Sequence, residues 1–379
     1  MKKLLVILAC CLLLALTLLC AGCGDIAAQL IDDEDGSGTD GGSEGGETAP
    51  VNTVPLALIT GASGIDGPGY AAAAWAGLSA FAEEKELTAD FYPAEEETQA
   101  SRLAAVGRAV ENGAQLIVCA GAEYGDTVYE AQNMYPQISF VLCDGEPHSL
   151  DFTAYETAAN TYAVLYTDRE AGYLAGYALV AEGFTKIGFM GGMPLPATVR
   201  CGAGFIQGVN QAAEDNDKEI DLYYTYTGLL QDDTSAQNLA GSWFANGIEA
   251  IYVCGDFTAS VCGAAEAANA WVIASDYDRW QLSPTVISST VKDIQGTVYQ
   301  AASAWADGSF WGGKQVTLGL TNAAVKLAMD NDRFNNFTAA KLRMLLNRFD
   351  NGELEIALVN SVDADLTALC GKKVHLNQE

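Results

Sequence analysis

The sequence predicts an α/β protein built on parallel sheets. Short apolar runs of strand length end in Gly or Asp, and segments with helical periodicity lie between them. Strands that are apolar throughout are buried on both faces, which happens when helices cover both sides of a parallel sheet. The chain has 379 residues, 50% of them hydrophobic, which is enough for two domains.

The elements follow in chain order. The predicted strands are residues 54–59, 114–121, 138–145, 185–192, 248–256 and 271–276. The predicted helices are residues 74–86, 101–113, 169–183 and 234–247. Ligands of such sheets bind beyond the carboxyl ends of the strands. We therefore expect binding residues in the segments 61–70, 121–126 and 191–196, and at the strand ends Asp144, Asp256 and Asp276.

The first 22 residues predict a signal peptide. Two lysines precede a long apolar run, and small residues precede Cys23. The apolar run is also close to the length of a membrane helix, so a retained anchor is the alternative. A bacterial lipoprotein signal has this shape, although Cys20 stands where Leu is usual. We expect cleavage after residue 22 and a lipid on Cys23.

Residues 23–52 predict a flexible tether, because they are acidic, rich in Gly and Ser, and bury little apolar surface. The whole chain carries 19 basic and 49 acidic residues, a formal net charge of −30. Such a field repels nucleic acid, which we do not expect as a partner. Solubility is the simplest explanation of the remaining acidity.

The sequence does not indicate an enzyme, a metal site or a cofactor. The cysteines beyond Cys23 form no disulfide framework and no CxxC or His-bearing spacing, and we expect them to be reduced. His148 and His375 are the two histidines, and neither belongs to a Ser-His-Asp or Cys-His pattern. The loop after the first strand lacks the Lys-Ser/Thr of a phosphate-binding loop.

An ordered set of motifs resembles a known family. The motifs are GIDGPGYAAAAWAG (64–77), REAGYLAGYALVAEGFTKIGFMGGMPLP (169–196), GAGFIQGV (202–209), WVIASDYD (271–278) and VISSTVKD (286–293). Together they resemble the basic membrane protein (BMP, PnrA-like) substrate-binding lipoproteins over roughly residues 53–327. The resemblance implies a type I periplasmic-binding-protein fold, with two doubly wound parallel-sheet lobes and a hinged cleft. Lobe 1 would comprise 53–165 with a return segment at about 290–315, and lobe 2 would comprise 166–289 with 316–379.

The resemblance also implies a function. We expect an extracytoplasmic, lipid-anchored, monomeric solute-binding protein that delivers a small neutral ligand to the permease of an ABC importer. The ligand would be a nucleoside, and a purine nucleoside by analogy with characterised relatives. One alternative is a ligand sensor of the same fold that acts through a membrane receptor. Another is a scavenging or adhesion lipoprotein that uses its surface instead of the cleft.

The implied ligand-binding residues lie on both sides of the cleft. Tyr70 matches the aromatic residue that stacks on the base, although it could instead pack under the first helix. Asp276 matches the residue that accepts the ribose hydroxyls, and a carboxylate can accept both hydroxyls of a diol. Lys292 matches a lysine that reaches the ribose, and its alternative is a solvated surface position.

Three further acids align with family positions, namely Asp66, Asp126 and Asp144. Asp66 and Asp126 could instead cap the helices that follow them. Two positions depart from the family: Gly61 replaces an acid that contacts the purine, and Leu230 replaces an aromatic residue. These departures leave purine selectivity open. Trp280, just beyond Asp276, could wall the cleft or pack at the hinge.

Overall fold

The computed structural model describes residues 54–378, whose strands form two sheets. The predictions for the signal peptide (1–22), Cys23 and the tether (23–52) lie outside the described residues. Both sheets are parallel except for one short edge strand, so the α/β prediction is confirmed. None of the helices in residues 54–378 has both the length and the apolar character needed to cross a bilayer.

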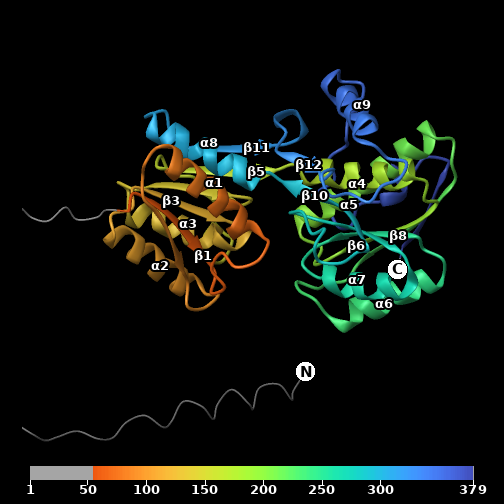
Figure 1. Cartoon of the computed structure of the whole chain (residues 1–379), viewed down its shortest axis with the longest axis horizontal. Coiled ribbons are helices and arrows are strands. Elements are labelled where there is room, and N and C mark those ends of the chain that lie inside the picture. Colours follow the sequence, from red (N-terminus) through yellow and green to blue (C-terminus); the bar gives the residue numbers. More distant parts are fainter. Residues whose placement is uncertain (1–53, 379) are drawn as a thin grey trace, which may run out of the picture. The chain divides into compact units, whose positions relative to one another are not determined.

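The first sheet has the strand order β11-β5-β4-β3-β1-β2, and every pairing in it is parallel. Helices α1 and α8 pack against each other on one face, and α2 and α3 cover the other face (Figure 1). The bounds are β1 (Leu56–Thr60), α1 (Tyr70–Glu84), β2 (Ala89–Pro93), α2 (Gln99–Glu111), β3 (Leu116–Ala120), η1 (Ala122–Tyr124), α3 (Gly125–Met134), β4 (Ser139–Cys143), β5 (Thr161–Tyr166), α8 (Ile294–Ala306) and β11 (Lys314–Leu318).

Strand β1 shows why this sheet needs helices on both faces. Successive side chains of a strand point to opposite faces. Leu56 and Leu58 pack on the side of α1 and α8, whereas Ala57 and Ile59 pack on the side of α2 and α3. All four side chains are buried, so the uninterrupted apolar sequence of β1 is explained by burial of both faces of the sheet.

The second sheet has the order β12-β10-β9-β8-β6-β7-β13, in which β12 alone runs antiparallel to its neighbour. Helices α4 and α5 belong to the core on one face, and α6 and α7 to the core on the other. The bounds are α4 (Asp168–Glu182), β6 (Lys186–Gly191), α5 (Pro196–Asp215), β7 (Ile220–Tyr226), α6 (Thr234–Ala245), β8 (Ala250–Cys254), α7 (Thr258–Ala268), β9 (Trp271–Ala274), β10 (Val286–Lys292), η2 (Leu320–Asn322), β12 (Val325–Leu327), α9 (Ala339–Asp350), η3 (Leu366–Leu369) and β13 (Val374–Gln378).

Helices α4 and α5 touch through their backbones. A Cβ atom on Gly172 of α4 would collide with the carbonyl of Cys201 in α5, and one on Gly204 of α5 would collide with the carbonyl of Arg169 in α4. Gly176 and Gly208 repeat this relation one turn further on. The close approach brings the N-terminal ends of the two helices together, which matters for the site described below.

The chain passes between the two sheets after β5, after β10 and again after β11. The first sheet therefore includes strand β11, and helix α8 packs against this sheet. Both elements come much later in the sequence than strands β1 to β5. Strand β10 belongs to the second sheet and ends at Lys292, immediately before the chain returns to the first. Lys292 thus occupies a connection between the two sheets.

Candidate functional site

A cavity of about 530 Å³ lies beyond the carboxyl ends of strands from both sheets. The loop after β1 and the first turn of α1 form one wall, and the segments after β8 and β9 contribute Asp256, Asp276 and Tyr277. Its volume falls within the range of about 300–1,000 Å³ that is usual for small-molecule sites. The loop after the first strand, which follows the carboxyl end of β1, is therefore part of a cavity wall.

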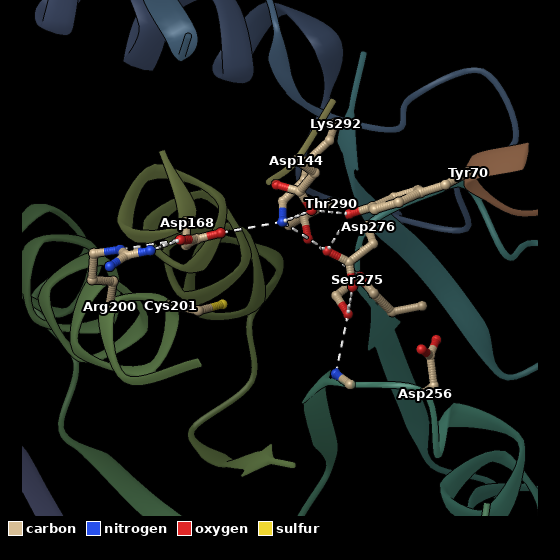
Figure 2. A network of polar contacts seen from close by, with 12 residues as sticks. Tyr70, Asp144, Asp168, Arg200, Cys201, Asp256, Ser275, Asp276, Thr290 and Lys292 are labelled. Atoms are coloured by element: carbon tan, nitrogen blue, oxygen red, sulfur yellow. Dashed lines mark hydrogen bonds and ion pairs between the residues drawn. The ribbon is translucent and has the colours of Figure 1, made fainter. Parts of the chain in front are cut away.

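Lys292 is the centre of a buried polar network that reaches this cavity through Asp144 and Asp276 (Figure 2). Its ammonium group lies 2.8 Å from Asp144 Oδ2, 3.2 Å from Asp168 Oδ1 and 3.2 Å from Asp276 Oδ1. The Lys292 side chain is only 9% exposed. It is therefore not a solvated surface lysine but a buried cation among three carboxylates.

Tyr70, the first residue of α1, links carboxylates from both sheets. Its hydroxyl lies 2.7 Å from Asp144 Oδ2, at the end of β4, and 3.1 Å from Asp276 Oδ1, at the end of β9 (Figure 2). A hydroxyl has a single proton, so it donates to one of these carboxylates at a time. At least one carboxylate oxygen is consequently left to accept from another donor.

Asp144 and Asp276 hold unusual backbone conformations. Asp144 directly follows β4 and has a φ of 57°. Asp276 lies two residues after the end of β9 and has a φ of 76°. Positive φ is uncommon outside glycine, although Asp tolerates it better than most residues, and such positions are frequent at ligand sites. The backbone is fixed on both sides, because Asp144 N–H donates to Val164 at 2.7 Å and Lys292 N–H donates to the Asp276 carbonyl at 3.0 Å.

The pKa values of the cluster follow from burial and charge. Burial and the neighbouring carboxylates raise the pKa of Asp144 in spite of Lys292. Burial alone would also raise the pKa of Asp276, but Lys292 and the Ser275 hydroxyl outweigh it and hold that pKa below its usual value. Burial would lower the pKa of Lys292, yet the surrounding carboxylates raise it well above normal. Lys292 is therefore charged at any physiological pH.

Asp168 and Arg200 complete the network and were missed in the sequence analysis. Arg200 of α5 donates to Asp168 Oδ2 from Nε at 3.1 Å and from Nη2 at 2.8 Å, while the other oxygen of Asp168 faces Lys292 (Figure 2). The glycine contacts between α4 and α5 make this pairing possible. An acidic first residue of a helix looks like an ordinary N-terminal acid, so the sequence holds no signal for this role.

The remaining predicted residues lie outside the polar network around Lys292. Asp66 is exposed on the cavity wall, and α1 has no side-chain cap. Asp126 is buried and pairs with Arg102 at 3.3 Å, so its carboxylate is occupied and it does not line the cavity. Leu230 is 65% exposed and, like Trp280, is not among the residues that line the cavity.

A second ring lines the cavity at a position that the sequence analysis did not single out. Tyr277 follows Asp276, and the Arg279 guanidinium lies 3.9 Å from its ring centroid. Arg279 is itself held by Asp256 at 2.6 Å. One face of the Tyr277 ring is thus covered by a fixed cation, an arrangement that restrains the ring.

The described residues offer groups for binding. Residues 54–378 contain no group of three or more His, Cys, Asp or Glu side chains placed to hold a metal. The cysteines of this part of the chain are free, and burial raises the pKa of Cys119 and Cys143 far above the range of a reactive thiol. Two parallel sheets that share a polar cavity at their carboxyl ends form the arrangement of a protein that binds a small molecule.

Comparison with known proteins agrees with this class. The family profile described as "ABC transporter substrate-binding protein PnrA-like" matches residues 55–357. The chain therefore belongs to the PnrA-like family of ABC transporter substrate-binding proteins, as its motifs indicated. Members bind solutes and pass them to a permease, so the expectation of a binding protein and not an enzyme is confirmed.

Individual relatives are distant. The chain is 28% identical over 309 residues to the "ABC transporter nucleoside-binding protein BmpA" of Lactococcus lactis, which covers 76% of this chain and 85% of the relative. It is 25% identical to an uncharacterized lipoprotein of Pyrococcus abyssi, over 55% of this chain and 53% of that one. An ABC transporter solute-binding protein of Aeropyrum pernix K1 superimposes with a TM-score of 0.64 at 20% identity, over 83% of this chain and 98% of the other. The last match confirms the two-lobed fold.

Proposed function

We propose that the cavity binds a nucleoside and that the protein delivers it to an ABC importer. The observation that carries the proposal is that Tyr70, Asp144 and Asp276, from both sheets, line one cavity, while the buried Lys292 contacts both carboxylates. The name of the Lactococcus relative, a nucleoside-binding protein, supports the same ligand class.

The ribose would bind at the carboxylates beside Lys292. Within the described residues, the hydrogen bonds to Asp144 from Tyr70 and Lys292 both reach Oδ2. Oδ1 of Asp144 is therefore available to a ligand hydroxyl. Asp276 accepts from Ser275 on one oxygen and from Tyr70 on the other, where Lys292 also lies. A carboxylate held this way has lone pairs left for a diol.

The base would lie against the aromatic rings. Tyr70 and Tyr277 line the same cavity, one from each lobe, and a ring stacked on a base contributes on the order of 1–3 kcal/mol. Tyr277 supplies a second aromatic surface, which the exposed Leu230 does not. No basic residue lines this cavity, and a buried phosphate without a cation is costly. These features favour a nucleoside over a nucleotide.

Isothermal titration tests the proposal with adenosine and 2′,3′-dideoxyadenosine. Loss of a hydrogen-bonding partner from a buried polar group costs about 1–3 kcal/mol, so Asp276→Asn should weaken adenosine binding about tenfold or more. The dideoxy compound should bind the wild type poorly and lose little more in the variant. Asp307→Asn, at an exposed acid that directly follows α8 and lies outside the cavity, is the control. Equal affinity of the two ligands for the wild type would show that Asp276 does not bind a diol.

We also propose that Cys23 carries the lipid anchor and that residues 24–52 tether the binding unit to the outer face of the cell membrane. The signal-like N-terminus and the lipoprotein relative from Pyrococcus abyssi support this location. Cys23→Ala should leave a chain that is either uncleaved or released from the membrane. A variant that is still correctly processed and anchored would refute the lipid site.

A further inference from the structure

The charged residues that line the cavity are all acidic. They come from four loops of the first sheet and two of the second, and no Lys, Arg or His lines this cavity. The carboxylates are those of Asp66, Glu97, Glu123, Asp144, Asp256 and Asp276. A nucleoside that enters this space meets acceptors on most sides.

Only some of these carboxylates form an ion pair with a basic side chain. Asp144 and Asp276 share Lys292, and Asp256 pairs with Arg279. In the described part of the chain, Glu97 and Glu123 form no ion pair with a basic side chain, and neither does Asp66. Asp66 lies on an exposed loop, whereas the two glutamates are held in position.

Glu97 is held against the end of β1. One of its oxygens, Oε1, accepts a hydrogen bond from the Ala62 N–H at 3.0 Å. The same oxygen occupies the space beside Gly61, where a Cβ atom would collide with it. The glycine that follows β1 therefore gives this carboxylate its place in the cavity wall.

Glu123 repeats the arrangement at the end of β3. Gly121 follows that strand with a φ of 127°, and a Cβ atom there would collide with the carboxylate of Glu123. Strands β1 and β3 are parallel neighbours, so both carboxylates lie at one edge of the sheet. Both carboxylates line the cavity together with Tyr124.

We propose that Glu97 and Glu123 accept N–H groups of the ligand, so that the cavity prefers a nucleoside whose base carries an exocyclic amino group. This inference rests on the nucleoside-binding function proposed above. An ionised carboxylate can only accept hydrogen bonds, and those it receives from N–H groups are charge-assisted. A base that turns a carbonyl oxygen toward the same carboxylates is repelled by them. The preference follows from this difference.

Guanosine and inosine isolate the amino group, because they differ only by that group on C2 of the base. Adenosine is a second probe, since it carries an amino group at C6 where inosine has a carbonyl, and its N1 lacks the proton that inosine carries there. Isothermal titration of the full chain in detergent at pH 8 should show at least tenfold tighter binding of adenosine or guanosine than of inosine. Glu97→Gln and Glu123→Gln should each reduce that ratio at least threefold, because an amide both donates and accepts.

Glu96→Gln is the matched control, since Glu96 is an exposed neighbour outside the cavity wall. In this variant, the ratio of the affinity for adenosine or guanosine to the affinity for inosine should equal that of the wild type. None of the three side chains belongs to the buried core, so the variants should fold, and equal melting temperatures would verify this. Equal affinity for all three nucleosides, or a ratio that neither variant changes, would overturn the inference while leaving nucleoside binding intact. Absence of binding by any nucleoside would overturn both.

Discussion

Replacement of Lys292 by Met removes the cation from the buried cluster at nearly constant volume. Lys292 lies 2.8–3.2 Å from three carboxylates, and at an effective dielectric constant of about 20 each contact contributes roughly 5 kcal/mol of gross attraction. Desolvation of the ammonium group offsets several kcal/mol of this. Removing one partner of a buried ion pair typically costs about 3–5 kcal/mol, and we expect Lys292→Met to lower the free energy of unfolding by that amount at pH 7.5.

The pH dependence of this loss has a definite sign. Without the ammonium group, the three carboxylates repel one another, and the pKa values of Asp144 and Asp276 rise in the folded state. The folded variant then binds more protons than the unfolded chain between roughly pH 4 and 7, so its stability falls as the pH rises. The difference between wild type and variant should therefore be smaller at pH 5 than at pH 7.5.

Urea unfolding of both proteins at the two pH values measures this difference. Lys326→Met is the matched control, because Lys326 makes a single contact with Asp293 at 3.2 Å and its side chain is 47% exposed. An exposed pair contributes about 0–1 kcal/mol. The reasoning is refuted if Lys292→Met costs no more than Lys326→Met, or if its cost grows on acidification.

Three other predictions use different measurements. Gly172→Ala should destabilise the protein by about 1–3 kcal/mol in thermal unfolding because its Cβ meets α5, whereas Gly241→Ala, in open space on α6, should be neutral or slightly stabilising. Tyr277→Ala should weaken nucleoside binding about tenfold in titration, and an unchanged affinity would remove this ring from the site. Burial raises the pKa of Glu123 to about 7, with Arg102 opposing and Asp144 and Asp256 adding to the shift. Because a nucleoside N–H group would bind the ionised carboxylate, nucleoside binding at pH 7 should release up to about half a proton per ligand. Calorimetric titration in buffers of different ionisation enthalpy measures this release, and proton uptake would contradict the prediction.

Much of the fold could be predicted because its central strands are buried on both faces. The apolar runs at 54–59, 114–121 and 138–145 correspond to β1, β3 and β4, which lie inside the first sheet. The edge strands were not predicted. Strand β2 (ADFYP) and strand β13 (VHLNQ) expose polar side chains, and an edge strand needs apolar residues on fewer sides, so its sequence lacks the continuous run.

The site was predictable where one residue type at a strand end carried the signal. The structure brings Tyr70, Asp144, Asp276 and Lys292 together, although their roles in binding are still to be tested. The acidity of the chain hid the rest. Glu97 is one of 49 acidic residues, and only its position against Gly61 distinguishes it from a solvated acid. Asp126 failed to join the cluster because Arg102, a residue of another helix, occupies its carboxylate.

The interleaved sheets also determine the order in which this protein can fold. Strand β11, one of the two edge strands of the first sheet, is synthesised after strands β6 to β10 of the second sheet. The second sheet closes only when Val374, near the end of the chain, pairs with Ile220. Neither lobe can be completed from one continuous segment of the chain, and contacts between distant residues form slowly. We therefore expect the folding chain to pass through states with unpaired strand edges until β13 pairs with β7, which makes residues 374–378 a segment on which the folding yield depends strongly.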